Sequence, residues 1–140
     1  MTREESLRRF GLVPSEADLP AIRALLAQEV EAELADDDRE DDLARLCCVQ
    51  LFSRGALDDV LRIWAAKSAS MDLDCVVDVQ FLCGAGLDAT KRYLAAQASP
   101  EAAEALRCLE DCEAAGDFLR FSPQEHLAHY RRYFGLDDGR

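Results

Sequence analysis

The stretch LCCVQLFSRGALDDVLRIWAAK, Leu46–Lys67, aligns without a gap with VVDVQFLCGAGLDATKRYLAAQ, Val76–Gln97, at an offset of 30 residues. The identical pairs are Val49 and Val79, Gln50 and Gln80, Leu57 and Leu87, Asp58 and Asp88, Arg62 and Arg92, Ala65 and Ala95, and Ala66 and Ala96. A fixed period of this length is typical of stacked helical hairpins. The repeat therefore predicts an all-α fold built from αα-hairpins.

The rest of the chain extends this pattern to about eight helices in one continuous domain. We expect an N-terminal helical pair in residues 1–35, an acidic linker in 36–42 and three αα-hairpin repeats in 43–136. Apolar spacing, capping residues and terminating glycines predict helices over 2–10, 19–34, 43–54, 57–68, 73–83, 87–98, 100–115 and 123–134. Such hairpins form either a short α-solenoid or a compact helical bundle.

The first hairpin separates into an inner and an outer helix. Residues 43–54 are apolar on nearly every face, which is typical of a helix buried on most sides. Residues 57–68 are amphipathic, and their polar members Asp58, Asp59, Arg62 and Lys67 are expected to face water. On that face Asp58 and Arg62 form an i, i+4 ion pair, which contributes roughly a few tenths of a kcal/mol.

The connection between these helices resembles a known repeat family. Gly55–Val60 followed by Ile63-Trp64 resembles the turn and second helix of an ankyrin repeat, and Gly86–Asp88 with Tyr93-Leu94 is a fainter copy. The Thr-Pro-Leu-His signature of that family is missing from both copies. The resemblance covers about two units and implies an architecture of stacked helical hairpins.

The charge balance restricts the classes of partner. The 140 residues carry a net charge of −12, with Lys and Arg scattered along the chain. Nucleic acid and anionic membranes are therefore not expected partners, and no apolar run reaches the roughly 20 residues of a membrane-spanning helix. We expect a cytoplasmic protein without a cofactor that binds another, basic protein. The identity of that protein and the oligomeric state stay open.

The most acidic segment lies between the N-terminal helical pair and the repeats. Repulsion among its carboxylates favours a solvated linker that is available to dock a basic surface. Trp64 and Tyr93 lie one position apart in the repeat alignment on the outer helices, where they either pack in the core or act as interface hot spots. The candidate binding residues are Asp36, Asp37, Asp38, Glu40, Asp41, Asp42, Trp64 and Tyr93.

These features predict a non-enzymatic module that binds another protein. One alternative, motivated by the acidic charge alone, is an immunity or antitoxin protein that neutralises a basic toxin. Another is a metal-dependent or thiol-dependent sensor or enzyme that uses His126, His129 and cysteines, with Cys108 and Cys112 as a redox pair at i, i+4.

Several polar and sulfur side chains are expected to be structural instead. All six cysteines are predicted to be reduced, small buried hydrophobes. We expect no metal site, because structural zinc generally shows two-residue Cys spacings. Gln50 and Gln80 share one slot of an apolar helix, so each amide is expected to tie its unit's helix to the next loop.

Overall fold

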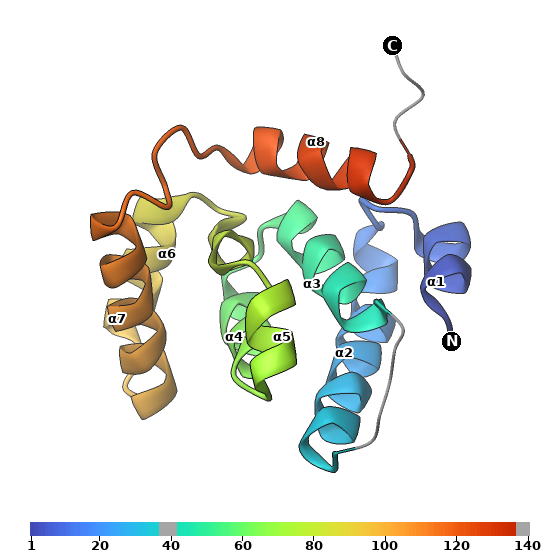
Figure 1. Ribbon diagram of the computed structural model, residues 1–140, viewed down its shortest axis with the longest axis horizontal. Helices are drawn as coiled ribbons and strands as arrows, with labels where there is room; N and C mark the ends of the chain where they lie inside the picture. The colour runs from blue at the N-terminus through green and yellow to red at the C-terminus, as the bar shows by residue number, and fades with distance from the viewer. Residues whose placement is uncertain (37–41, 137–140) are drawn as a thin grey trace.

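The computed structural model describes residues 1–36 and 42–136, and this part of the chain contains eight α-helices, three short 3₁₀ helices and no strand (Figure 1). The α-helices are α1 (Arg3–Phe10), α2 (Leu19–Leu34), α3 (Leu43–Arg54), α4 (Val60–Lys67), α5 (Met71–Val76), α6 (Leu87–Ala96), α7 (Pro100–Ala114) and α8 (Pro123–Tyr133). The 3₁₀ helices are η1 (Glu16–Asp18), η2 (Leu57–Asp59) and η3 (Val79–Cys83). The predicted all-α fold is confirmed.

The helices α2 to α7 form a row, and α8 lies across one side of it (Figure 1). The helices α6 and α7 occupy one end of the row, and α4 and α5 the middle. The helix α3 lies between α5 and α2, and α1 flanks α2 at the other end. The helix α2 packs against α3 and α4, while α6 packs against α7. Among the described residues, no helix is both long enough and apolar enough to cross a bilayer.

The helix α3 is central to the hydrophobic core. Nine of its twelve residues are buried, which confirms the expectation for the apolar stretch 43–54. The helix ends at Gly55, whose φ of 65° lies in the left-handed region that glycine adopts most readily. Because α3 is buried on most sides, the neighbouring helices pack around it.

Two glutamines connect the inner segments to other parts of the chain, as structural amides, but Gln50 bonds to an earlier segment and not to the next loop. Gln50 Nε2 donates to Gly11 O at 2.8 Å and to Ser6 Oγ at 3.2 Å, which ties α3 to the end of α1. Gln80 Nε2 donates to Asp117 O at 2.9 Å, beyond the end of α7. In both cases a side-chain amide satisfies a backbone carbonyl outside the regular helices.

The second copy of the repeat corrects one prediction. A single helix over 73–83 is wrong, because the chain forms α5, breaks at Val77 and Asp78, and resumes as η3. Val77 (φ −94°, ψ 101°) and Asp78 (φ −62°, ψ 142°) both have extended backbone. The break leaves the last carbonyl groups of α5 without helical partners.

Two basic side chains from α3 and α4 bond to these carbonyl groups. Lys67 Nζ donates to Asp74 O at 2.8 Å and to Val77 O at 2.7 Å. Arg45 Nε donates to Val76 O at 3.0 Å. Cations at this position also interact favourably with the C-terminal end of the helix dipole. The short α5 is therefore stabilised by contacts with other helices.

The turns after α3 and η3 meet backbone to backbone. A Cβ atom on Gly84 would lie 2.3 Å from Phe52 O and 3.0 Å from Gly55 Cα. The rings of Phe52 and Phe81 pack next to this contact, with centroids 5.8 Å apart. Because neither backbone can retreat without moving its element, position 84 requires glycine.

The ion pairs between α2 and α4 also correct the prediction. Asp59 was expected to face water, but it is only 1% exposed. Its carboxylate accepts hydrogen bonds from Arg23 Nε at 2.7 Å and Arg23 Nη2 at 3.0 Å. Arg62 Nη1 donates to Asp59 Oδ1 at 3.0 Å and to Asp58 O at 2.8 Å. Arg62 therefore bonds the backbone of Asp58, and the buried carboxylate of Asp59 joins both arginines.

Candidate functional site

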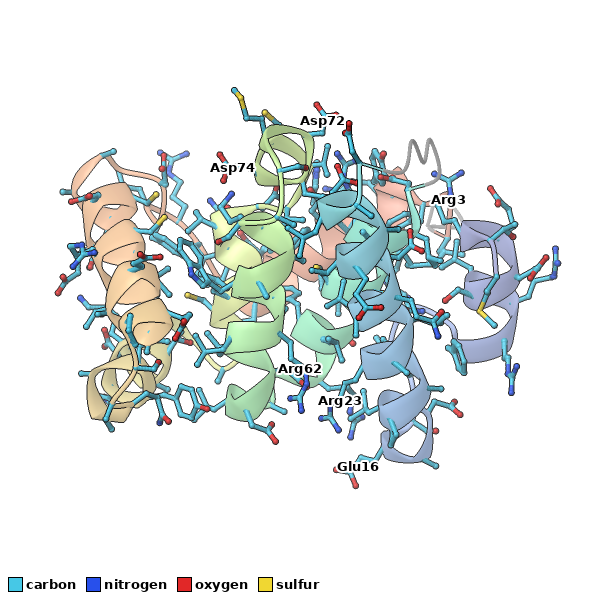
Figure 2. The ribbon with its side chains drawn as sticks, turned by 90° about the horizontal axis from the view of Figure 1, so that it is seen from below. Arg3, Glu16, Arg23, Arg62, Asp72 and Asp74 are labelled. Atoms are coloured by element: carbon cyan, nitrogen blue, oxygen red, sulfur yellow. The ribbon has the colours of Figure 1, made fainter. Side chains whose placement is uncertain are left out.

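The last turn of α2 and the start of α5 together form an acidic end of the molecule. Ser70 Oγ donates a hydrogen bond to Glu33 Oε1 at 2.7 Å, which joins the two helices, and the same hydroxyl caps α5. Figure 2 shows Asp72 and Asp74 at this edge of the molecule. The acidic end consists of Glu33, Asp36, Asp72 and Asp74. Its carboxylates are presented from two helices that are fixed to one another.

Two exposed apolar side chains accompany these carboxylates. Leu34 is 67% exposed and Met71 is 85% exposed, and each directly follows one partner of the Ser70 to Glu33 hydrogen bond. Covering such side chains with a partner removes apolar surface from water, which favours association. The acidic end therefore combines negative charge with apolar contact area.

Lys67 brings a positive charge close to the acidic end, but its ammonium group is already engaged. Nζ lies 3.2 Å from Asp74 Oδ1, and the lysine side chain is only 12% exposed, so the expectation that Lys67 faces water is wrong. The carbonyl oxygens at the end of α5 take its other hydrogen bonds. Asp36, Asp72 and Asp74 are all exposed to solvent, and the ion pair with Lys67 partly neutralises Asp74.

The structure separates the residues of the predicted acidic linker. Asp36 is exposed at the end of α2. Asp42 instead accepts a hydrogen bond from Tyr133 OH at 2.7 Å and forms ion pairs with Arg45 at 3.6 Å and Arg3 at 3.7 Å. Its carboxylate holds α8 beside the start of α3, and this hydrogen bond, together with burial, raises the pKa of Tyr133. The remaining residues lie outside the described ones: Asp37, Asp38, Glu40 and Asp41.

The two aromatic candidates belong to the edge of the core. Trp64 on α4 and Tyr93 on α6 are half-buried, and both pack against buried hydrophobic residues. Packing of this kind fixes the rings and leaves only part of each one at the surface. A role for these rings in an interface stays a prediction.

A second polar centre lies where α8 passes the break between α5 and η3. Asp78 Oδ2 accepts a hydrogen bond from Tyr130 OH at 2.6 Å and lies 3.1 Å from His126 Nε2. Burial raises the pKa of Asp78, but the hydrogen bonds from His126 and Tyr130 outweigh it and hold the pKa below its ordinary value. Burial and the bond to Asp78 raise the pKa of Tyr130. These three residues are called the Asp78 centre.

Aromatic rings surround the Asp78 centre and define the environment of the two histidines. The His126 ring packs edge-on against Phe52 at 5.7 Å and Phe81 at 5.5 Å. His129 lies 6.3 Å from His126, ring to ring, and is exposed. Their spacing singled out both histidines, but it did not find Asp78. The signal in the sequence that could have found Asp78 is its position within the apolar run 75–79, which it alone interrupts.

A cavity of about 290 Å³ opens beside the two histidines. Its lining includes Gln80, Asp117, Arg120, Phe121, Glu125 and His126. Gln80 is engaged with Asp117 O, and Ser122, also at this cavity, accepts the Glu125 N–H at 3.1 Å as the cap of α8. Within residues 1–36 and 42–136, no group of three or more His, Cys, Asp or Glu is arranged to hold a metal ion.

The cysteines do not all share one environment, which corrects the prediction that all six are buried. Cys47, Cys48 and Cys83 are buried, and burial raises the pKa of the Cys47 and Cys83 thiols to about 12. Cys75 is exposed. Cys108 and Cys112 are half-buried, and burial followed by the neighbouring Cys108 raises the pKa of Cys112 to about 11. Raised values disfavour the reactive thiolate.

Comparison of the chain with protein-family models, with curated proteins and with solved structures finds no match.

Proposed function

We propose that this protein is a non-enzymatic binding module whose acidic end docks a basic partner protein. The observation that carries the proposal is the pairing of exposed carboxylates with exposed Leu34 and Met71 on two helices joined by the Ser70 to Glu33 hydrogen bond. A rigid surface of this kind loses little conformational entropy on binding.

Charge and apolar area contribute in different ways. The net charge of −12 steers a basic protein toward the chain, an effect that weakens as salt increases. The apolar side chains contribute contact area that salt does not screen. Binding through the acidic end is therefore expected to persist in part at high salt, with a slower association rate.

The Asp78 centre supports a structural interpretation of the histidines. His126 and Tyr130 both direct their polar atoms to the same carboxylate, and the surrounding rings pack α8 onto α3 and η3. These bonds hold a helix in place. The proposal therefore assigns His126 to the fold and the acidic end to recognition.

The test is co-purification from the native host with identification of the partner, followed by affinity measurements. The variant combines Asp36→Asn, Asp72→Asn and Met71→Ser, and Asn is suited to position 36 because it tolerates the φ of 60° found there. The matched control is Glu101→Gln with Glu104→Gln, two exposed acids of α7 at the other end of the row.

We expect a basic partner whose affinity for the triple variant falls roughly 5- to 30-fold, since exposed charge pairs contribute about 0.2–1 kcal/mol each and Met71 adds apolar area. The α7 control is expected to bind like the native chain. Equal loss in both variants, an unchanged salt dependence, or a partner without basic character contradicts the proposal.

A further inference from the structure

A groove of about 230 Å³ runs between α2 and α4. Figure 2 shows Arg23 and Arg62, at one end of it, on the edge opposite Asp72 and Asp74. Its lining includes Arg23, Leu26, Val30 and Glu31 of α2 and Arg62 and Ala65 of α4. The small side chains of Ala27 and Ala65 leave the space between the two helices open. The term α2/α4 groove refers to this feature.

One end of the α2/α4 groove carries two guanidinium groups in fixed positions. Both bond to the carboxylate of Asp59, which is 1% exposed and so cannot turn away to solvent. Figure 2 shows Arg23 and Arg62 side by side between the two helices. Asp58 also interacts electrostatically with Arg23, so two carboxylates balance the two guanidinium charges, and what this end offers a ligand is guanidinium N–H donors.

The arginines also retain hydrogen-bonding capacity. The bonds within the described residues use Nε and Nη2 of Arg23 and Nη1 of Arg62. Arg23 Nη1 and Arg62 Nη2 therefore remain for a ligand, and guanidinium groups favour the planar geometry of a carboxylate.

The rest of the groove has a different character. Leu26 and Val30 form an apolar floor beyond the arginines, and exposed Glu31 supplies a negative charge at the other end. Arg23 and Glu31 are eight positions apart on α2, a rise of about 12 Å. A matching ligand carries a carboxylate, an apolar group and then a positive charge over that length.

We propose that the α2/α4 groove binds the C-terminal tail of a polypeptide. The α-carboxylate lies at Arg23 and Arg62, the apolar last side chain covers Leu26 and Val30, and a Lys or Arg three residues before the end faces Glu31. Three residues of extended chain span about 10 Å, which matches the separation of the two charged ends. The proposal does not depend on binding at the acidic end.

The test uses fluorescence anisotropy with a labelled Lys-Ala-Ala-Leu peptide that ends in a free carboxylate. Its comparison peptides are the C-terminal amide and a version with Ala in place of Lys. The protein variants are Arg62→Gln and Glu31→Gln, because Arg62 is more exposed and makes one hydrogen bond to the Asp59 carboxylate, whereas Arg23 makes two. Arg92→Gln on α6 is the matched control, since Arg92 is the repeat equivalent of Arg62.

We expect Arg62→Gln and C-terminal amidation each to weaken binding about tenfold, because each removes a charge-assisted hydrogen bond. Glu31→Gln is expected to weaken the Lys peptide roughly threefold and to leave the Ala peptide unchanged. Arg92→Gln and the acidic-end variant are expected to bind like the native chain, so failure of this proposal is distinguishable from failure of the proposed function.

Equal affinity for the amide, no effect of Arg62→Gln, or no detectable binding of the free-carboxylate peptide overturns the proposal. Octanoate serves as a competitor without a peptide backbone or a positive charge. If octanoate binds the native chain as tightly as the peptide, the groove is a site for apolar carboxylates in general, and the assignment to a polypeptide tail is wrong.

Discussion

The contact between the turns after α3 and η3 makes Gly84 the most demanding position in the fold. In Gly84→Ala the new Cβ would sit 2.3 Å from Phe52 O, about 1 Å closer than ordinary carbon-to-oxygen contacts of roughly 3.3 Å. The backbone of Gly84 is in the right-handed helical region (φ −61°, ψ −26°), so alanine meets no conformational strain there. The steric contact alone opposes the substitution.

The expected loss of stability combines two effects of opposite sign. Overpacking in a core costs about 1–3 kcal/mol, and the cost is at the upper end or above it when backbone has to move. Alanine recovers about 0.4–1 kcal/mol by restricting the unfolded chain. We expect Gly84→Ala to lower the free energy of unfolding by about 2–3 kcal/mol and the Tm by roughly 10 °C.

The measurement is urea unfolding followed by circular dichroism and by the fluorescence of Trp64, the single tryptophan. Gly135→Ala is the comparison, because a Cβ there meets nothing within 4 Å and only the φ of 73° opposes it. Its cost is about 1 kcal/mol. A Gly84→Ala midpoint at or above that of the native chain refutes the backbone contact.

Three further outcomes are expected. Asp78→Asn lowers the free energy of unfolding by about 2–3 kcal/mol at pH 7. Because the pKa of Asp78 is lowered in the folded protein, its carboxylate stabilises the fold at pH values above its ordinary pKa of 3.8. In urea unfolding at several pH values, the difference in unfolding free energy between the variant and the native chain therefore narrows as the pH falls below 3.8. An aromatic disulfide reagent modifies Cys75 rapidly in the folded protein and Cys48 only on unfolding, and loss of the fast phase in Cys75→Ser checks the assignment. Asp59→Asn lowers stability by about 2–4 kcal/mol in the same unfolding assay, since the two arginines lose their buried partner; a change below 0.5 kcal/mol contradicts that reading.

Helix positions could be predicted wherever the deciding contacts are local. The bounds of α2 and α3 match the sequence-based ranges 19–34 and 43–54, because apolar spacing and a terminating Gly55 act within a few residues. The break at Asp78 could not be predicted in this way. Its carboxylate is bonded by side chains 48 and 52 positions later, and such pairing leaves no periodic signal.

The candidate sites show the same limit. Charge composition predicts an acidic surface, but the apolar period of α2 includes Leu34 and gives no sign that this side chain is 67% exposed. Likewise, the i, i+4 spacing suggested a partner for Arg62 within its own helix. The actual carboxylate is shared with Arg23, which lies 36 positions before Asp59.

The position of α8 has a consequence for how the chain is made. Its anchors lie far back in the sequence, since Tyr130 bonds to a residue 52 positions earlier and Tyr133 to one 91 positions earlier. At ribosomal rates of about 5–20 residues per second, Tyr130 emerges roughly 3 to 10 seconds after Asp78. During that interval the nascent protein has no α8 to cover Phe52 and Phe81. Until α8 has emerged, the apolar faces of α3 and η3 that it covers stay exposed on the nascent chain.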